Sequence, residues 1–381
     1  MNILIATGVR RVREAGAASV AFHHADELEK LGHKVELWFM GDLLPKPRWP
    51  ARFASLEFAA AVSKRIKQDP SRFDVANIHA PWGCVYGVAR KWSSRSDLPP
   101  YVFTMQGSEE RYALAMRFEH QKGRATNFAW KNRVWHRLYH QRLYDYSVAT
   151  ANFGAVAARE GWTLSELKYS HPSGRIWFVP NGTDEEFFLP RTFSESAAPN
   201  KLLFVGTWLD RKGIYYLVDA FSALASELPA ATLTVAGCVV GDPEVKADFP
   251  SAIRDRVTVI PQLSRGEMPQ LYTSHDLFVF PSLVEGMPLS LLEAMATAMP
   301  VVTTTACGMA DVVENEYNGL LVPAADAPAL TAAIRRYFTE PVLRQRLGRV
   351  AQETARRYTW KNIAVQMEHI FKLAAQSRTA P

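Results

Sequence analysis

Short apolar strands alternate with helical segments along nearly the whole chain, and this alternation limits the possible fold more than any other feature. The first unit reads NILIAT, then an arginine-rich loop, the helical AASVAFHHADELEKL and the strand KVELWFM. Further strands are expected at VANIH, YVFTM and SVAT, with helical stretches at 51–68, 84–93 and 126–144. Strands separated by helices form parallel sheets that helices cover on both faces.

The alternation starts again after residues 192–199, whose Ser, Ala and Pro content is typical of a connection between domains. A second series follows, with strands KLLFVG, ATLTVAG, RVTVIP, DLFVFP and PVVTT and a helix around LSLLEAMATA. The 381 residues exceed the roughly 250–300 at which one hydrophobic core stops growing. The sequence therefore predicts two Rossmann-like α/β domains. The last helical stretch, within 359–381, could cap either of them.

Composition indicates an ordinary globular protein, because 48% of residues are hydrophobic and 22% are charged. The three cysteines, Cys84, Cys238 and Cys307, lie too far apart for a metal site or a disulfide framework. The apolar N-terminus is too short for a signal peptide, and no stretch reaches the roughly 20 apolar residues of a membrane span. We therefore expect a cytoplasmic protein.

The net charge of +6 is concentrated in residues 111–142, which hold eight Lys or Arg and only one acid, Glu119. Such a segment attracts nucleic acid, anionic lipid or a phosphorylated substrate. No nucleic-acid-binding signature is present, so no nucleic-acid partner is expected. The interleaved aromatics suit peripheral contact with an anionic membrane. Alternatively, Trp130, Val134 and Leu138, four residues apart, form the core-facing side of a helix.

One segment, PSLVEGMPLSLLEAMATAMPVV, carries the strongest chemical signal. It runs from a strand end through Glu285 into a helix that contains Glu293. Ligands of open α/β sheets bind at the carboxyl ends of strands, and helix N-termini attract phosphate. The two carboxylates could accept hydrogen bonds from sugar and ribose hydroxyls. For an isolated pair, the alternative of a solvated loop charge and a surface helix residue would be favoured.

A second segment, VGTWLDRKGIYYLVDAF, places Arg211 and Lys212 between a strand and a helix, directly before Gly213. Two cations in such a loop can neutralise a diphosphate without a metal ion. The alternative is an exposed turn with two solvated bases. No Asp-x-Asp motif is present to chelate a divalent metal, so we expect no metal and no cofactor.

Together these motifs resemble those of the family-4 glycosyltransferases of the GT-B fold, over nearly the whole chain. The resemblance implies two Rossmann-like domains that face a central cleft, with boundaries at 1–180 for the acceptor domain and 181–358 for the donor domain. It also implies that the C-terminal helix, 359–381, crosses back onto the N-terminal domain. The matching positions are the Glu-x7-Glu pair Glu285 and Glu293, the basic pair Arg211 and Lys212, the junction Pro180, Asn181 and Gly182, and Asn318 with Gly319 in NGLLVP.

By this resemblance, the C-terminal domain holds a nucleoside-diphosphate sugar, with uridine as the default base and guanosine as the alternative. Arg211 and Lys212 hold the diphosphate, Glu293 holds the ribose, and Glu285 lies against the donor sugar. The remaining donor-binding positions are Gly286, Met287, Pro288 and Leu289 after Glu285, and Gly16 from the other domain. In retaining members of the family, the leaving phosphate itself takes the proton of the acceptor. The catalytic candidates are Glu285, Arg211, Lys212 and His79.

The acceptor side is less well matched. His79 follows the strand VANIH and fits an acceptor-side position of the family, although a lone histidine is more often structural. Gln106 stands where many members have a histidine, and glutamine cannot act as an acid or base. Three arginines of the first loop, Arg10, Arg11 and Arg13, could hold an acceptor phosphate or could be solvated.

The sequence thus predicts a retaining glycosyltransferase that moves a hexosyl group to a glycan or lipid-linked acceptor, in polysaccharide or glycoconjugate biosynthesis. Peripheral contact with the inner face of the cytoplasmic membrane would bring it to a lipid-linked acceptor. The alternatives are a nucleotide-sugar epimerase or a phosphorylase of the same fold, and a catalytically silent carbohydrate-binding relative. A dehydrogenase is disfavoured because ATGVRRVREAG lacks the glycine spacing of a dinucleotide site.

Overall fold

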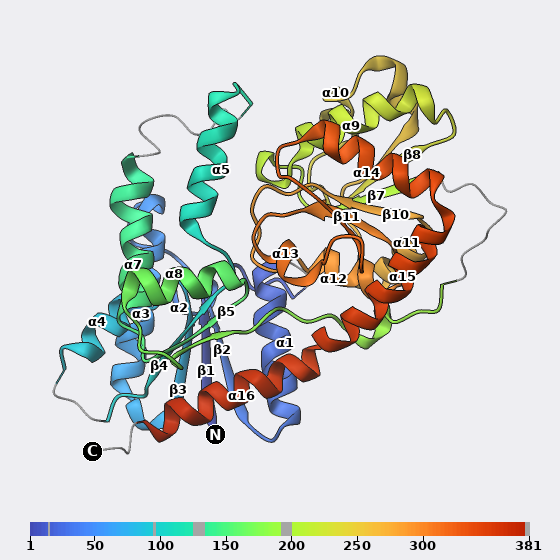
Figure 1. Cartoon of the computed structure of the whole chain (residues 1–381). Helices are drawn as coiled ribbons and strands as arrows, with labels where there is room; N and C mark the ends of the chain where they lie inside the picture. The colour runs from blue at the N-terminus through green and yellow to red at the C-terminus, as the bar shows by residue number, and fades with distance from the viewer. Residues whose placement is uncertain (14–15, 94–96, 125–133, 192–199, 378–381) are drawn as a thin grey trace. The chain divides into compact units, whose positions relative to one another are not determined.

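The computed structural model divides the chain into two α/β units, and it describes residues 1–13, 16–93, 97–124, 134–191 and 200–377 (Figure 1). Unit 1 comprises Met1–Glu110, Ala129–Asn181 and Trp360–Pro381, and unit 2 comprises Arg111–Phe128 and Gly182–Thr359. The C-terminal segment thus belongs to the N-terminal unit. Residues 111–128, which the sequence analysis placed in the N-terminal domain, group with unit 2.

Unit 1 is built on a six-stranded sheet in the order β2-β1-β3-β4-β5-β6. All neighbouring strands are parallel, and the register places Ala6 beside Ile78. Four of the six strands are buried along most of their length, which explains their continuous apolar sequences. The strands are β1 (Asn2–Thr7), β2 (Lys34–Phe39), β3 (Val75–His79), β4 (Tyr101–Met105), β5 (Phe153–Val156) and β6 (Ile176–Phe178).

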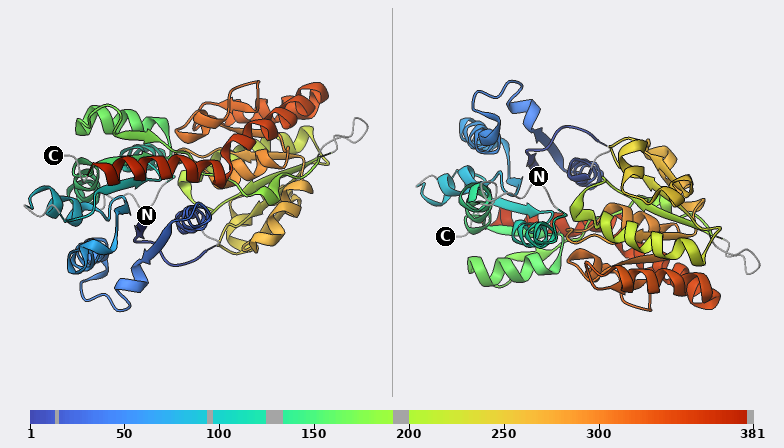
Figure 2. Two further views of the ribbon diagram at one scale, coloured as in Figure 1. Left: turned by 90° about the horizontal axis from the view of Figure 1, so that it is seen from below. Right: turned by 90° about the horizontal axis from the view of Figure 1, so that it is seen from above.

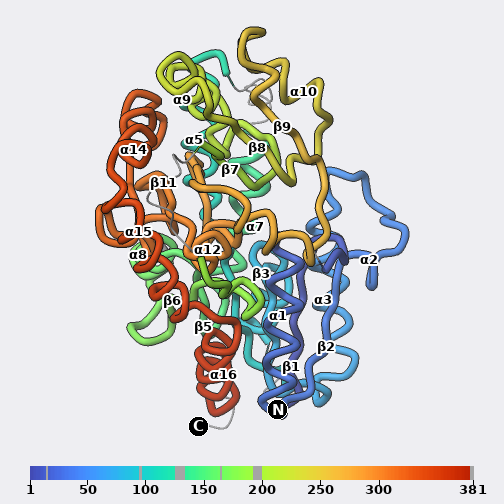
Figure 3. The backbone as a smooth tube through the Cα atoms, turned by 90° about the vertical axis from the view of Figure 1, so that its right-hand side faces the viewer, coloured from blue at the N-terminus to red at the C-terminus, as the bar shows by residue number. Residues whose placement is uncertain are grey.

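Helices lie on both sides of this sheet, as Figure 2 shows. One layer contains α1, which packs against α16, and Figure 3 shows α1 alongside β1. The other layer contains α3, α4 and α7, and α4 packs against both α3 and α7. The apolar residues of α16 recur at helical spacing, and that face is buried against α1 and the sheet. The helices are α1 (Gly16–Lys30), α2 (Met40–Leu43), α3 (Ala54–Gln68), α4 (Cys84–Lys91), α7 (Gln141–Ala149), α8 (Arg159–Tyr169) and α16 (Trp360–Gln376).

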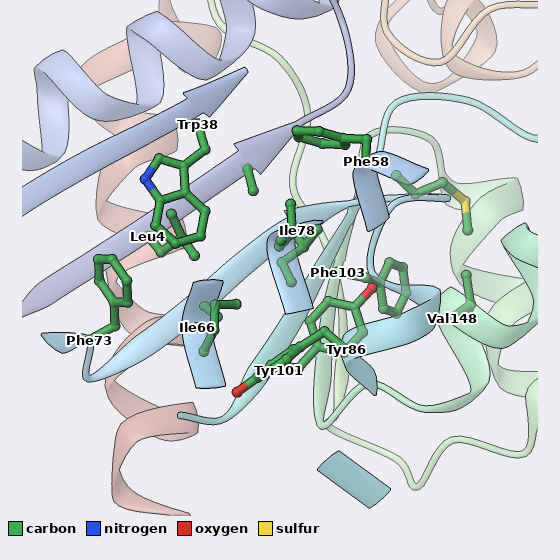
Figure 4. Packing of buried hydrophobic residues seen from close by; sticks show 14 of the residues in the cluster. Leu4, Trp38, Phe58, Ile66, Phe73, Ile78, Tyr86, Tyr101, Phe103 and Val148 are labelled. Atoms are coloured by element: carbon green, nitrogen blue, oxygen red, sulfur yellow. The ribbon is translucent and has the colours of Figure 1, made fainter. Parts of the chain in front are cut away.

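The unit 1 core is rich in aromatic side chains, which Figure 4 shows between the sheet and its helices. Tyr86 and Tyr101 are fully buried, and each hydroxyl has a partner: the Tyr86 hydroxyl donates to the Pro99 carbonyl oxygen, and the Tyr101 hydroxyl contacts Ser147. Buried hydroxyls need such partners, because an unmatched one costs about 1–3 kcal/mol.

Unit 2 has a second parallel six-stranded sheet, in the order β12-β11-β10-β7-β8-β9. Its strands are β7 (Lys201–Val205), β8 (Thr232–Ala236), β9 (Val257–Ile260), β10 (Leu277–Phe280), β11 (Val301–Thr304) and β12 (Leu320–Val322). The helices are α9 (Ile214–Glu227), α10 (Asp242–Ala247), α11 (Met268–Thr273), α12 (Leu289–Ala296), α13 (Gly308–Val312), α14 (Ala327–Thr339) and α15 (Pro341–Ala355). The predicted fold class, two Rossmann-like domains, is confirmed.

The strand order reverses once in each sheet, between β1 and β3 in unit 1 and between β7 and β10 in unit 2. At such a switch point, the loops that leave two neighbouring strands diverge to opposite faces of the sheet. Ligands of doubly wound folds bind in the crevice this leaves outside the carboxyl ends of the strands. The segments that follow β7 and β10 carry the strongest sequence motifs, and the topology brings them to one place.

Helix α5 (Glu109–Gln121) and the residues after it dock on α9 of unit 2. The buried Glu119 carboxylate accepts from the Tyr216 hydroxyl at 2.5 Å, and Lys122 lies 3.2 Å from the same hydroxyl. Arg124 pairs with Asp219 at 3.2 Å. Two of the eight bases of segment 111–142 are therefore engaged within unit 2, and residues 125–133 lie outside the described part of the chain.

The predicted core-facing positions Val134 and Leu138 are instead exposed, and Trp130 lies outside the described residues. Helical spacing alone could not tell a core side from an apolar surface. Within the residues that the structure describes, none of the helices combines the length and apolarity needed to cross a bilayer.

Candidate functional site

The loop after β7 is shaped by two glycines. Gly206 has a φ of 153°, and Gly213 has a φ of 71° at the start of α9. A Cβ atom on Gly213 would lie 1.9 Å from the Pro281 carbonyl oxygen, so only glycine fits there. Between them, Asp210–Lys212 form a 3₁₀ turn. This turn places the Lys212 ammonium 4.9 Å from the centre of the Phe280 ring, beside the end of β10.

The loop after β10 contacts the loop after β7 at the Arg211 carbonyl oxygen. The Leu283 amide donates to the Arg211 carbonyl oxygen at 2.8 Å, and the Ser282 hydroxyl oxygen lies 3.0 Å from the same oxygen. A Cβ atom on Gly308 would lie 1.5 Å from the Gly286 carbonyl oxygen. The backbone around Gly286 is therefore held in close contact with the start of α13.

Three charged side chains meet between these loops. The Glu285 carboxylate lies 2.6 Å from the Arg211 guanidinium and 2.7 Å from the Lys212 ammonium, and the Ser282 hydroxyl donates to it at 3.0 Å. Lys212 and Glu285 are nearly buried, with side chains 11% and 12% exposed, whereas 31% of the Arg211 side chain is exposed. The sequence-predicted residues Arg211, Lys212 and Glu285 are thus brought together, and the exposed-turn alternative is wrong for Lys212.

The charges of this triad do not balance, because two cations share one carboxylate. Burial raises the pKa of Glu285, but Lys212 and Arg211 outweigh burial and hold its pKa below the ordinary value. Burial and the like charge of Arg211 lower the pKa of Lys212, although Glu285 opposes this. A bound anion would supply the missing negative charge. The triad is therefore arranged to hold an anionic group at the carboxyl end of the sheet.

The helix that follows begins after Pro288, which is its N-cap residue, and Leu289 is its first residue. Gly286, Met287 and Pro288 are buried, so this part of the predicted donor site offers mainly backbone to a ligand. The Leu292 amide already donates to the Pro288 carbonyl oxygen at 3.4 Å, as the first turn of a helix requires.

Glu293 lies in α12 and forms a second charged group in unit 2. It accepts from the Tyr272 hydroxyl at 2.8 Å and from Arg265 at 3.2 Å. Its side chain is 7% exposed, so the alternative of a surface helix residue is wrong. Burial raises the pKa of the Glu293 carboxyl, although Arg265 and Tyr272 oppose this shift.

Arg265, at the start of a 3₁₀ turn (Arg265–Glu267), is a residue that the sequence analysis missed. It contacts three carboxylates, those of Glu293, Asp184 and Glu186, and its guanidinium lies 5.2 Å from the centre of the Phe187 ring. Its only signal in the sequence is a basic residue after IPQLS, which does not specify these contacts.

The predicted acceptor residues of the first loop lie in unit 1, and Arg11 and Arg13 have ion-pair partners there. Arg11 pairs with Asp42 at 2.7 Å, and Arg13 pairs with Asp26. Arg10 is exposed. Gly16 is the first residue of α1, exposed, with a φ of 39°. The first loop therefore holds its arginines partly through ion pairs within the unit.

The other acceptor candidates lie at the carboxyl ends of β3 and β4, two central strands of the unit 1 sheet. His79 ends β3 and is 2% exposed, and burial lowers its pKa to about 4, so it is neutral at pH 7. Burial likewise lowers the pKa of the neighbouring His24 to about 3. Neither His24 nitrogen nor the His79 Nε2 atom has a hydrogen-bond partner among the described residues. Gln106 follows β4 and is partly buried.

Cysteine and metal chemistry has little support in the structure. Cys84 and Cys238 are buried, and burial raises the pKa of the Cys84 thiol to about 11. Within the described ranges, no three His, Cys, Asp or Glu side chains are grouped as metal ligands would be. The expectation that no metal is needed stays a prediction.

Comparison with known proteins shows which family and which fold the chain resembles. Residues 199–340, which contain the Arg211, Lys212 and Glu285 triad as well as Arg265 and Glu293, match the family described as Glycosyl transferases group 1. A D-inositol 3-phosphate glycosyltransferase from Xylanimonas cellulosilytica is 29% identical over 230 residues, covering 56% of this chain and 54% of that protein. A phosphatidyl-myo-inositol mannosyltransferase from Mycobacterium leprae is 24% identical over 343 residues, covering 88% and 83%. The chain thus spans about half the length of the first of these relatives.

Solved structures share the whole architecture. A sucrose-phosphate synthase from Thermosynechococcus elongatus superposes with a TM-score of 0.76 at 20% identity, covering 99% of both chains. The Anabaena HepE protein, solved in complex with UDP-glucose, superposes with a TM-score of 0.68 at 17% identity, covering 98% of this chain and 100% of that one. At this identity the likeness shows the fold alone. The chain has the GT-B fold, and its residues 199–340 match the group 1 glycosyl transferases.

Proposed function

We propose that the chain is a retaining glycosyltransferase that moves a hexosyl group from a nucleoside-diphosphate sugar to a glycan or lipid-linked acceptor. The observation that carries this proposal is the uncompensated triad of Arg211, Lys212 and Glu285 at the switch point of unit 2. A diphosphate supplies the negative charge that this triad lacks. The match of residues 199–340 to the group 1 family supports the same reaction class.

In this proposal, Arg211 and Lys212 stabilise the leaving diphosphate. The acceptor oxygen forms a bond to the anomeric carbon while the bond from that carbon to the diphosphate oxygen breaks. The acceptor proton passes to the leaving phosphate, so no separate base is consumed. Cations that hold the developing charge act most strongly in a water-poor site, and Lys212 is nearly buried.

Glu285 is better placed to position the donor sugar than to attack it. One of its oxygens, Oε1, already accepts from Arg211, Lys212 and Ser282. A carboxylate oxygen engaged in this way is a weak nucleophile, whereas its second oxygen remains suited to a sugar hydroxyl. This arrangement favours retention through the leaving phosphate over a covalent intermediate on Glu285.

We take uridine as the default base and guanosine as the alternative. The Anabaena neighbour with the same fold was solved with UDP-glucose, which supports the first. The phosphatidyl-myo-inositol mannosyltransferase is named for a lipid acceptor, which supports a lipid-linked glycan as the acceptor class.

Contact with an anionic membrane is part of the same proposal. On α5, Leu114 and Phe118 are exposed one turn apart, with Arg117 exposed beside them. Apolar side chains next to bases suit the membrane interface. Sedimentation with anionic vesicles tests this: Leu114→Asp with Arg117→Glu should release the protein, whereas Arg335→Glu in α14 should not. Equal binding to neutral and anionic vesicles, or none, would favour an acceptor in solution.

Incubation with UDP-glucose, UDP-galactose and GDP-mannose, with and without a lipid-linked glycan, tests the reaction. We expect transfer only when acceptor is present, and an early product whose anomeric proton signal shows retention. Epimerisation of the donor without acceptor would instead indicate the epimerase alternative, and an inverted product would overturn the retaining mechanism.

A further inference from the structure

We propose that Arg265 is a positioning residue for the donor nucleotide: it keeps Glu293 ionised and oriented toward the ribose, and it links that carboxylate to the junction segment at Asp184. This inference rests on the proposed function, because it assumes that unit 2 binds a nucleoside diphosphate. It adds a residue to which neither the family match nor the sequence motifs assign a role.

The Arg265 guanidinium is held on several sides at once. Its Nη1 atom lies 3.2 Å from Glu293, its Nε atom lies 3.5 Å from Glu186, and its Nη2 atom contacts Asp184. The Phe187 ring lies against the guanidinium, with a distance of 5.2 Å to the ring centre. A planar guanidinium can serve several acceptors in fixed directions, whereas a lysine ammonium could not reach all of them.

Arg265 also faces an excess of carboxylates. Three carboxylates surround one guanidinium, so this group has two negative charges too many, the opposite of the triad at Glu285. The groups that act on the Glu293 carboxyl are Arg265, the Tyr272 hydroxyl and the Asp184 carboxylate. Burial and Asp184 favour the protonated form of Glu293, and Arg265 is the cation that opposes them.

In this proposal, Glu293 binds the ribose as an ionised carboxylate. An ionised carboxylate accepts hydrogen bonds at both oxygens, which matches the two neighbouring hydroxyls of a ribose. A protonated Glu293 would lose part of this capacity. Tyr272 occupies one oxygen and Arg265 the other, so a ribose must share Oε1 with Arg265 or Oε2 with Tyr272. The orientation of the carboxylate therefore depends on both partners.

Through Asp184, Arg265 also contacts the segment by which the chain enters unit 2. Asp184 follows Thr183, whose amide donates to the Tyr358 carbonyl oxygen at 2.7 Å and which bridges to Thr359. The chain passes between the units on either side of this bridge, after Asn181 and after Thr359. Arg265 thus contacts both the Glu293 carboxylate and the segment where the chain enters unit 2.

Titration calorimetry of the full chain with UDP and with GDP, at about pH 5.5 and about pH 8.5, tests the inference. For the nucleotide that the wild type binds, we expect Arg265→Met to weaken binding about tenfold more at the acid pH than at the alkaline pH, relative to wild type. The reason is that Glu293 without Arg265 takes up a proton at a higher pH. Discrimination against the 2′-deoxy nucleotide should fall in the same variant.

Two further variants isolate the cause. The double variant Arg265→Met with Glu293→Gln should lose the extra pH dependence, because its residue 293 cannot titrate. Since the terminal phosphate of the nucleotide also titrates near pH 6, each curve is compared with wild type. Arg335→Met is the matched control, because Arg335 pairs with Glu227 on the surface of the same unit. Its affinity and pH profile should equal those of wild type.

The outcomes separate this inference from the proposed function. Wild-type protein that binds neither nucleotide would contradict the proposed function itself. Wild-type binding with an unchanged affinity and pH profile in Arg265→Met would overturn only the role of Arg265. If Arg265→Met does not fold, Arg265→Lys serves as the test. Lysine keeps the positive charge but lacks the planar guanidinium that contacts several carboxylates at once. We therefore expect weaker nucleotide binding with a nearly wild-type pH profile. Binding equal to wild type would overturn the inference.

Discussion

The switch points of the two sheets are built from opposite chemistry. In unit 2, Arg211, Lys212 and Glu285 meet as charged groups within 2.7 Å. In unit 1, the end of β3 presents the buried, neutral His79 next to His24. The same topology therefore carries a net positive triad in one unit, whereas in the other it carries a neutral histidine and loop arginines of which Arg11 and Arg13 are paired with carboxylates. The fold therefore determines where a site can form, and the residues of the loops determine whether that site is charged.

Among the variants that test this difference between the units, Glu285→Ala is expected to have the largest effect on stability and on the transfer rate. The change leaves Lys212 buried without a carboxylate partner, which costs about 3–5 kcal/mol of folding free energy. If Glu285 positions the donor sugar as proposed, transfer should also fall more than about 100-fold. Urea unfolding and initial rates measure the two effects. Glu227→Ala, at an exposed ion pair of the same unit, is the control, and equal behaviour of the two variants would contradict the assigned role of Glu285.

A smaller effect is expected from Gly213→Ala, which tests the backbone that positions Lys212. The added Cβ atom would meet the Pro281 carbonyl oxygen, and the φ of 71° is strained for alanine. We expect a loss of about 1–3 kcal/mol in stability and a raised KM for the donor. Gly41→Ala in unit 1, where no atom lies within 4 Å of the new Cβ, is the control. A donor KM that stays at the wild-type value would show that the loop tolerates displacement.

Unit 1 should in turn be sensitive to acid through its histidines. The folded pKa values of His24 and His79, about 3 and about 4, lie below the ordinary value, so the unfolded state takes up protons first. The stability they contribute is present above pH 6.5 and is lost as pH falls toward 4, by up to about 1.4 kcal/mol per pH unit for each histidine.

The variant His24→Phe tests this, because phenylalanine fills the buried site and cannot titrate. Its stability should depend less on pH between about 6.5 and about 4, and it should equal or exceed that of wild type at alkaline pH. His369→Phe, at an exposed position of α16, should keep the wild-type profile. An unaltered acid slope in His24→Phe would show that His24 is not held neutral.

Chelation of divalent metal ions is expected to leave the rate of transfer unchanged. If Arg211 and Lys212 neutralise the diphosphate, transfer should continue at its full rate in excess EDTA. Loss of activity that magnesium or manganese restores would show that the charges of the triad are insufficient.

Much of the fold could be predicted because strand and helix periods are local. The buried strands, such as β1 and β10, read as continuous apolar runs, and the helix α16 reads as an apolar face. The triad could be predicted because its members follow two strands whose ends a switch point brings together. Arg265 could not, because its partners lie on three separate segments and only the folded chain brings them to one guanidinium.

The surface of segment 111–142 was predicted least well. The spacing of Val134 and Leu138 is equally consistent with a buried helix face and an exposed one, and the structure shows the exposed one. The docking of residues 119–124 on α9 depends on Tyr216 and Asp219, about a hundred residues away along the chain. Long-range pairs of this kind leave no periodic signal in the sequence.

The central claim is that unit 2 holds the diphosphate of the donor through Lys212, and calorimetric titration with UDP and GDP tests it most directly. The account predicts that Lys212→Ala weakens binding of the preferred nucleotide by about 1.5–3 kcal/mol. It also predicts that His79→Gln in unit 1 and Lys246→Ala on the surface of unit 2 bind it as wild type does. Unchanged affinity in Lys212→Ala, or a larger loss in His79→Gln, would contradict the account.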